Sequence, residues 1–130
     1  MTQDESDSAA ASALAVMERH IHALNGLREN ALAETLHLPH FRLVGTTLDC
    51  WPSAETYLSD FRARAGDVWA KTAWQAIDVQ RESADKVHLA VRINRFDTND
   101  QLIADFDSVW VITLKNGKWA VQFRSSSAAS

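Results

Sequence analysis

The sequence has few of the residues that cross-link or interrupt a small protein. Its 130 residues include one cysteine, two prolines and four glycines. The lone Cys50 excludes a disulfide within the chain and is typical of a reduced compartment. No cysteine cluster and no helical histidine pair at metal-ligand spacing is present, so we expect no metal site. Glycine-rich phosphate loops and a G-x-S-x-G motif are also missing, which argues against nucleotides and serine nucleophiles. We therefore expect no cofactor.

Charge is concentrated only at the start of the chain. The 13 Lys and Arg residues are scattered among 17 Asp and Glu residues, so we expect no nucleic-acid partner. No apolar run approaches the roughly 20 residues of a membrane span. Asp4, Glu5 and Asp7 make the first residues acidic, where a signal peptide would be basic. We expect a disordered acidic tail over residues 1–8, a single domain over 9–130, no membrane partner and a cytoplasmic location.

Periodic apolar residues are the main positive signal. Over residues 9–24 they recur at intervals of three and four, which predicts a helix with one apolar stripe. Asp7 or Ser8 can cap its start, and Asn25-Gly26 is typical of a left-handed end. The stripe is formed by Leu14, Met17, Ile21 and Leu24.

Two further helices are expected before the middle of the chain. One runs from about residue 27 to residue 37, because Pro39 forbids the helix from continuing. The other begins at Pro52 or Ser53 and continues to Ala65.

Alternating patterns predict strands in the rest of the chain. Apolar residues at every second position from Val87 to Ile93 have the period of a half-buried strand. Asn116-Gly117 is the favoured dipeptide of a tight hairpin. After it, Trp119 alternates with Val121 and Phe123, which indicates that these three side chains face the core. The expected strands cover residues 41–48, 69–81, 87–94, 102–114 and 119–123. The order predicts an α+β fold with helices packed on one face of a curved sheet.

That order and three local segments resemble the nuclear transport factor 2-like superfamily, especially its SnoaL-like, ketosteroid-isomerase-like members. The segments are Ala23-Leu24-Asn25, His37-Leu38-Pro39-His40-Phe41-Arg42-Leu43 and Asn116-Gly117-Lys118-Trp119. The resemblance spans nearly the whole chain. It implies a cone-like, mostly antiparallel sheet wrapped around three helices of the N-terminal half, a pocket between sheet and helices, and a homodimer formed through the outer sheet face. The superfamily includes isomerases, dehydratases, cyclases, epoxide hydrolases and binding proteins, so the fold leaves function open.

Two enzymatic patterns of these relatives can be compared with the chain. A ketosteroid-isomerase-like site uses a carboxylate base near the first strand, together with a tyrosine and a protonated carboxylic acid. Here that region reads Leu38-Pro39-His40, and the only tyrosine is Tyr57 in the third predicted helix. An epoxide-hydrolase-like site needs an Asp-Arg-Asp network. Its candidates are Arg95 and Asp97 with either Asp105 or Asp107. The alternative is that the charged residues near the predicted turn are simply exposed to solvent.

His40 and Arg42 are the leading candidates for a pocket wall. They lie two residues apart, so on a strand both side chains point to the same side. An imidazole can move a proton near neutral pH, and a guanidinium can hold a carboxylate or an enolate. The structural alternative is that His40 tethers the corner between helix and strand, while Arg42 pairs with an acid such as Asp105 or Asp107.

Aromatic and cationic side chains on later strands extend this candidate site. Trp74 and Trp110 can provide flat apolar walls for a ring-shaped ligand, or simply pack in the core. Arg95 and Arg124 can each offer a cation to an acidic ligand, with a surface salt bridge as the ordinary alternative. The strand face opposite Val87 carries His88, Arg92 and Asn94. We expect this polar face to line either a pocket or the dimer interface.

The leading hypothesis is a homodimeric domain that binds a small apolar or aromatic molecule between sheet and helices. Its candidate ligand-binding residues are His40, Arg42, Trp74, Trp110 and Arg124. One alternative is a cofactor-free acid/base enzyme of the isomerase, dehydratase or cyclase type, with His40 as the candidate catalytic residue. The other is a dimeric interaction module without a pocket, which a filled and fully apolar interior would favour.

Overall fold

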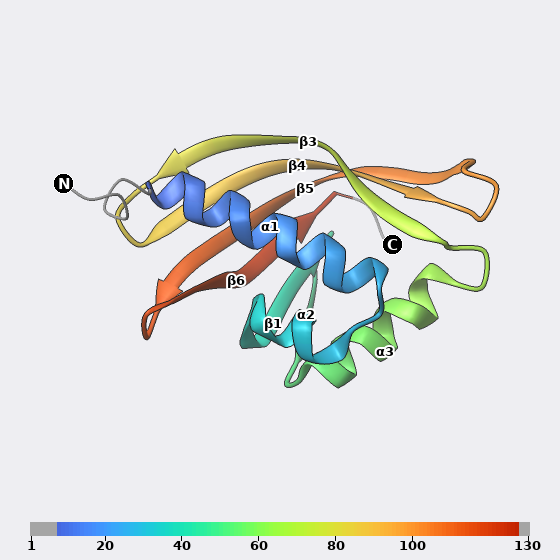
Figure 1. The fold of residues 1–130 in the computed structure, drawn as a ribbon, viewed down its shortest axis with the longest axis horizontal. Coiled ribbons are helices and arrows are strands. Elements are labelled where there is room, and N and C mark those ends of the chain that lie inside the picture. The colour runs from blue at the N-terminus through green and yellow to red at the C-terminus, as the bar shows by residue number, and fades with distance from the viewer. Residues whose placement is uncertain (1–7, 128–130) are drawn as a thin grey trace.

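The computed structural model describes residues 8–127 and has the predicted α+β architecture, with three helices and a curved six-stranded mixed sheet (Figure 1). The predicted acidic tail lies outside the described residues, except for Ser8. The elements are α1 (Ala9–Asn25), α2 (Glu29–Glu34), β1 (Leu36–Val44), β2 (Thr47–Trp51), α3 (Ala54–Ala65), β3 (Lys71–Glu82), β4 (Lys86–Phe96), β5 (Leu102–Lys115) and β6 (Lys118–Ser126). None of the helices described is long and apolar enough to cross a membrane.

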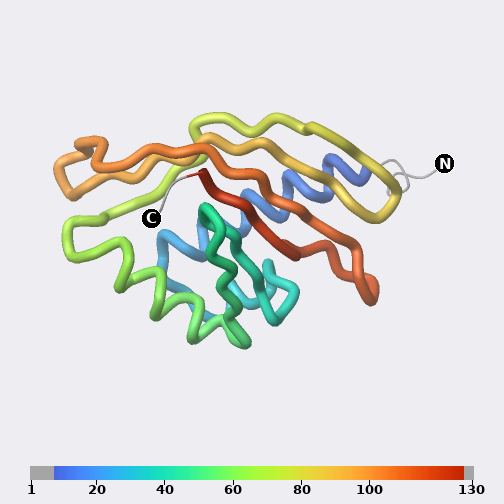
Figure 2. The backbone as a smooth tube through the Cα atoms, turned by 180° about the vertical axis from the view of Figure 1, so that it is seen from behind, coloured from blue at the N-terminus to red at the C-terminus, as the bar shows by residue number. Residues whose placement is uncertain are grey.

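The sheet has the strand order β2-β1-β6-β5-β4-β3. Only the β1–β6 pair is parallel, and the other neighbours are antiparallel. The last strand therefore lies inside the sheet and joins the β1–β2 hairpin to the meander of β3, β4 and β5. In the view from behind, the strands of this meander and β6 lie in front of α1, so the helix covers only one face of the sheet (Figure 2). We call the covered face the inner face and the other the outer face.

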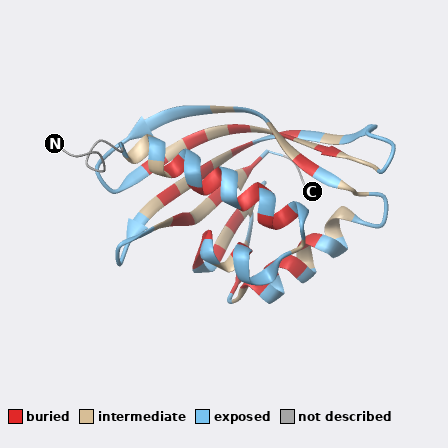
Figure 3. Ribbon diagram, in the orientation of Figure 1, coloured by how far each residue is buried: buried red, intermediate tan, exposed pale blue. Residues whose placement is uncertain are grey.

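Helix α1 is anchored to β3 by hydrogen bonds as well as by packing. The Asn25 side chain donates to the Thr72 carbonyl oxygen (2.9 Å) and accepts from the Thr72 backbone N–H (2.8 Å). Trp74 donates from its indole Nε1 to the carbonyl oxygen of Met17 (3.0 Å). These bonds hold the helix along the inner face, where its buried stripe meets the buried residues of the strands (Figure 3).

The buried stripe of α1 differs from the predicted one. Leu14 is 40% exposed, while the small residue Ala13 is fully buried. His20 is also fully buried, one turn after Val16. Small side chains let the helix approach the sheet closely, so the stripe is rotated toward Ala13 and His20. The apolar spacing alone placed the larger Leu14 in the core, which is wrong.

The ends of the helices follow the predicted chemistry with one correction. The Ser8 side chain caps α1 by accepting from the Ala11 N–H (3.0 Å), and Ser53 caps α3 by accepting from the Thr56 N–H (3.1 Å). The left-handed residue after α1 is Leu27 (φ 53°), whereas Gly26 has a right-handed φ of −87°. The expected left-handed end is therefore one residue later than the glycine.

The first strand of the prediction is in fact a hairpin. Its residues are divided between β1 and β2, which are joined by a turn at Gly45 with φ +58°. The preceding helix ends at Glu34 rather than at residue 37, because the chain there already pairs with β6: the Val121 N–H donates to the Thr35 carbonyl oxygen (2.8 Å).

A bulge decides the orientation of the last strand. Val111 pairs with Phe123, but the next residue, Ile112, pairs with Val121. Val121 is therefore buried in the core, while Phe123 is half-buried on the outer face. The predicted alternation from Trp119 is thus wrong at Phe123. The hairpin before β6 is as predicted, with positive φ at Asn116 (54°) and Gly117 (76°).

Candidate ligand site inside the cone

His40 and Arg42 both face the interior, as their spacing predicted, and both are buried. Arg42 donates from Nη2 to a carboxylate oxygen of Asp49 on β2 (3.0 Å). Arg42 therefore pairs with an acid, as the structural alternative proposed, but the acid is Asp49 and neither Asp105 nor Asp107.

His40 makes only ring contacts. Its imidazole stacks on Trp51 at a centroid distance of 5.9 Å and meets the edge of Tyr57 at 5.2 Å. Neither ring nitrogen forms a hydrogen bond with any residue that the structure describes. His40 therefore does not tether the helix-to-strand corner, and both of its nitrogens are available inside the cone.

Tyr57, like His20, is a residue of this interior that the sequence did not predict as part of the site. Ser53 starts α3 in a register that turns Tyr57, Leu58 and Phe61 inward. The Tyr57 side chain is fully buried, and its hydroxyl has no partner among residues 8–127. A lone tyrosine four residues before Phe61 on a helix was the available signal, because a pair at this spacing shares one face.

His20 brings α1 into the same interior. Its Nδ1 lies 2.9 Å from the Thr35 hydroxyl oxygen, whose own proton is donated to the Leu32 carbonyl oxygen (2.8 Å). Nδ1 must therefore be the donor, which leaves Nε2 as a bare acceptor. That nitrogen is buried and has no partner among the described residues.

The two candidate tryptophans lie next to His20. Its ring is stacked with Trp74 at 6.3 Å and meets the edge of Trp110 at 5.1 Å. Since the Trp74 indole nitrogen is already bonded to Met17, this residue can offer only its ring surface. The Trp110 Nε1, in contrast, is buried without a partner in the described part of the chain. Trp110 can therefore offer both a wall and a hydrogen-bond donor.

Two arginines complete the arrangement from neighbouring strands. Arg124 on β6 lies over the rings of Tyr57 (5.3 Å) and Trp110 (5.1 Å). Arg95 on β4 lies over Phe61 (5.3 Å) and Phe106 (5.2 Å). Each is only 7% exposed. Neither forms a hydrogen bond or an ion pair with any described residue, so the surface salt bridges considered for them are absent from residues 8–127.

These side chains form what we call the interior cluster, and each of them has a buried nitrogen or oxygen without a partner. The cluster comprises His20, His40, Tyr57, Arg95, Trp110 and Arg124. The space left between Arg95, Arg124 and the surrounding rings is about 10 Å³, comparable to the room needed by one water molecule. None of the residues lining that space is acidic. The interior is therefore nearly filled, but it is far from fully apolar.

Burial sets the charge of the cluster. It lowers the pKa of His20 to about 3, with Arg124 as the second cause. The pKa of His40 is held well below 6.5, first by burial and then by Arg124. Burial also lowers the pKa values of Arg95 and Arg124 to about 10 each. Near neutral pH both histidines are thus neutral and both arginines are charged.

The epoxide-hydrolase-like network is not assembled. Asp105 and Asp107 bind the Arg92 guanidinium at 2.9 and 3.0 Å on the outer face, whereas Arg95 points inward. Asp97 instead accepts the Asn99 backbone N–H (2.8 Å) at the hairpin turn. Within residues 8–127, no three His, Cys, Asp or Glu side chains are arranged to hold a metal ion.

Comparisons with known proteins agree on the fold. No protein-family model matches the chain, and no curated protein matches its sequence. A nuclear transport factor 2-like protein from Cytophaga hutchinsonii superposes with a TM-score of 0.68 at 17% identity, over 99% of this chain and 100% of that one. A ketosteroid isomerase-like protein from Erwinia carotovora atroseptica gives 0.65 at 18% identity, over 92% and 95%. The chain has the nuclear transport factor 2-like fold. A protein of unknown function with a cystatin-like fold from Nostoc punctiforme gives 0.72 at 13% identity, over 92% and 90%.

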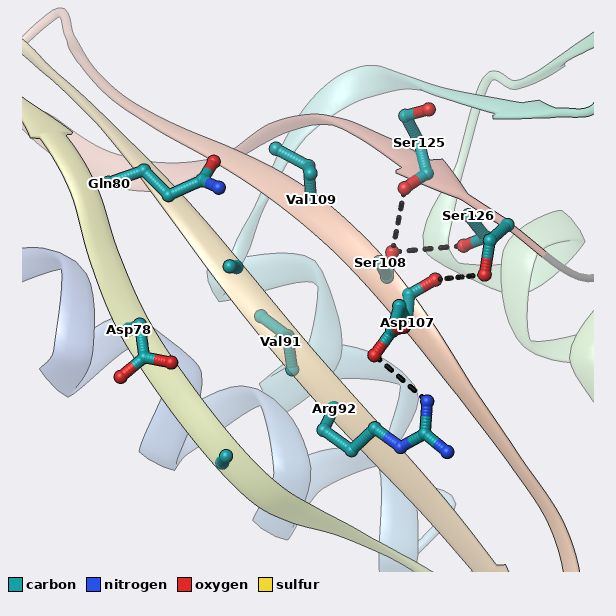
Figure 4. Close-up of a pocket in the computed structure, with 12 residues that line it drawn as sticks. Asp78, Gln80, Val91, Arg92, Asp107, Ser108, Val109, Ser125 and Ser126 are labelled. Atoms are coloured by element: carbon teal, nitrogen blue, oxygen red, sulfur yellow. Dashed lines mark hydrogen bonds and ion pairs between the residues drawn. The ribbon is translucent and has the colours of Figure 1, made fainter.

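The outer face of this nuclear transport factor 2-like sheet has a different chemistry. It carries a hollow of about 410 Å³ between β3 and β6. Arg92 and Asp107 cross it as a bonded pair, and Ser108 donates to the Ser125 carbonyl oxygen (3.1 Å) at its edge (Figure 4). His88, Arg92 and Asn94 lie on this outer side, so they do not belong to the interior cluster.

Proposed function

We propose that this chain binds a small, partly aromatic molecule inside the cone, in contact with the interior cluster. One observation carries the proposal: six buried side chains from α1, α3 and four strands meet there, and each has a polar atom without a partner. Buried polar groups in folded proteins are nearly always hydrogen-bonded. Leaving several unsatisfied at one place is costly unless another molecule bonds to them.

The chemistry of the cluster supports a ligand that is polar at one end and flat at the other. Unpaired donors are present on Trp110, Arg95 and Arg124, and the His20 Nε2 is an unpaired acceptor. The face of Trp74 supplies an apolar wall beside them. Because the open space is only about 10 Å³, the apolar part of the ligand has to displace neighbouring side chains instead of filling a ready-made cavity.

Native mass spectrometry of the freshly purified protein tests this proposal directly. We expect an additional mass that is released on denaturation and can be identified. The matched variants are His40→Phe inside the cluster and His22→Phe on the exposed face of α1. The first should lose the additional mass and the second should keep it. The proposal is wrong if no compound is retained and no aromatic fragment of a screened set perturbs the tryptophan fluorescence.

Acid/base catalysis by His40 is the second candidate function. It is favoured by a neutral imidazole with two available nitrogens, 5.2 Å from the Tyr57 ring. A ketosteroid-isomerase-like mechanism has less support, since no carboxylate lines the space inside the cone. Because burial holds the pKa of His40 well below 6.5, its turnover of an identified ligand should show no inflection near that pH. His40→Gln should abolish turnover while the unfolding midpoint is retained. Unchanged turnover in this variant would remove His40 from the mechanism.

The predicted homodimer through the outer face belongs to the same proposal. The apolar side chains Val109, Val111 and Phe123 lie half-buried on that face. No helix within residues 8–127 covers it (Figure 2). Apolar patches of this kind often mark protein contacts. Sedimentation should give twice the chain mass, and Val111→Lys should shift it to the monomer. A wild-type monomer at high concentration would contradict this part and would also count against a dimeric interaction module.

A further inference from the structure

The arginines of the interior differ in whether a carboxylate neutralises them. Arg42 binds Asp49 at 3.0 Å and Arg64 binds Asp60 at 2.7 Å. Arg95 and Arg124 are as deeply buried as Arg42 and deeper than Arg64, yet no carboxylate of residues 8–127 lies within ion-pair distance of either. Two positive charges therefore lie without an ion-pair partner among residues 8–127, around a space that no acidic side chain lines.

The aromatic rings hold these two guanidinium groups but do not satisfy them. A ring attracts a cation through its face, so Tyr57 and Trp110 fix the plane of Arg124, while Phe61 and Phe106 fix that of Arg95. The rings provide no hydrogen-bond acceptor for the N–H groups at the edge of each guanidinium. Both Nε atoms are buried and unpaired. A cation that is clamped by rings and unbonded at its edge is pre-organised for an anion.

The remaining polar atoms near the pair agree with this. Trp110 adds an unpaired indole N–H beside Arg124. Both arginines line the same small space, together with Trp74 and Trp110. A carboxylate is the organic group that matches this set, because its two oxygens accept several hydrogen bonds and pair with guanidinium in a planar fashion.

We propose that the ligand is a small aromatic carboxylic acid whose carboxylate binds between Arg95 and Arg124 and whose ring lies against Trp74 and Trp110. This inference rests on the proposed function and specifies the chemical class of its ligand. The limited space favours an acid with a single ring over a large polycyclic compound.

Benzoate and benzamide provide a matched pair of probes, since they share one shape and differ in charge. Titration followed by the unfolding temperature and by tryptophan fluorescence should detect benzoate at millimolar concentration and not benzamide. Arg124→Gln and Arg95→Gln should each weaken benzoate by roughly thirtyfold or more. Arg92→Gln, which removes a guanidinium from the outer face, should bind benzoate as the wild type does.

The outcomes separate the two proposals. Equal binding of benzamide and benzoate, or undiminished binding by Arg95→Gln and Arg124→Gln, would overturn the carboxylate assignment and leave small-molecule binding standing. Failure of benzoate and phenylacetate to bind at all would overturn the assignment as well. Protection by inorganic sulfate equal to that by benzoate would show a site for any anion and would also refute an aromatic acid.

A measurement without ligand provides an independent check. If Arg124 is present for binding, Arg124→Met should raise the unfolding midpoint of the empty protein, because it removes an uncompensated buried charge. A lowered midpoint would show that Arg124 stabilises the fold through its rings, and the anion proposal would then be wrong for this residue.

Discussion

The two faces of the sheet differ in how their arginines are exposed and paired. On the outer face, Arg92 is 37% exposed and is bonded to both Asp105 and Asp107. On the inner face, Arg124 is 7% exposed and has no carboxylate partner in the described chain. Water already solvates the charge of Arg92. The buried charge of Arg124 would be stabilised most by a carboxylate partner, and it has none among the described residues. Selection for stability alone would favour the reverse, since unpaired buried charges are costly.

Removing a wall of the interior should have the largest effect. Trp110→Ala leaves a cavity and removes no hydrogen bond, so we expect a loss of about 3–5 kcal/mol in the free energy of unfolding. Urea denaturation measures it. Phe123→Ala is the matched aromatic control on the outer face and should cost less than half as much. An equal loss at Phe123 would mean that another surface covers this face in solution.

Acid should weaken the interior next. His20 and His40 have native pKa values below 6.5, so under mild acid the unfolded chain binds protons that the native state does not. Stability is therefore fully retained above pH 6.5 and falls below it, by roughly 1 kcal/mol per pH unit for each histidine. The slope of unfolding free energy between pH 6.5 and about 5 measures this.

Two variants test which histidine causes this dependence of the unfolding free energy on pH. His20→Asn keeps a side-chain donor near Thr35 and should remove one histidine's share of the slope. His22→Gln changes an exposed ring and should leave the slope as in the wild type. A slope unaffected by His20→Asn would show that this ring is charged in the native state.

The smallest effect should come from the outer face. Arg92→Gln breaks two exposed ion pairs, which salt screens and water replaces. We expect no resolvable shift of the urea midpoint at moderate ionic strength. A clear destabilisation would mean that the Arg92 network is shielded from solvent, and the contrast between the two faces would then be weaker than we describe.

Much of the fold follows from local sequence rules. Ser53, the Asn116-Gly117 dipeptide and the alternation in β4 each determine a short segment by their own chemistry, so these elements were predicted. The rotation of α1 was not predicted, because the packing of the helix against the sheet decides that Ala13 is buried and Leu14 is exposed. The orientation of Phe123 depends on a bulge at Gln122 in its own strand, which only the pairing with β5 reveals.

The interior could be predicted only where one strand carries two of its residues. His40 and Arg42 share a face by their spacing, and that inference needs no tertiary contact. Tyr57 and His20 come from different helices, and their meeting with Arg124 depends on how both helices lie against the sheet. Whether Arg95 forms an ion pair depends on neighbouring side chains that are far away in the sequence.

The position of β6 inside the sheet has a consequence for how the protein is made. Because β6 lies between β1 and β5 and follows both in the sequence, the β1–β2 hairpin that carries His40 cannot join the meander until β6 has been synthesised. The parallel pairing of Leu36 with Val121 closes a very long loop, and such closures slow folding. The part of the interior that the hairpin shares with the meander therefore forms only after β6 has been made, and a translation product that stalls before β6 would expose the aromatic residues of this part to chaperones.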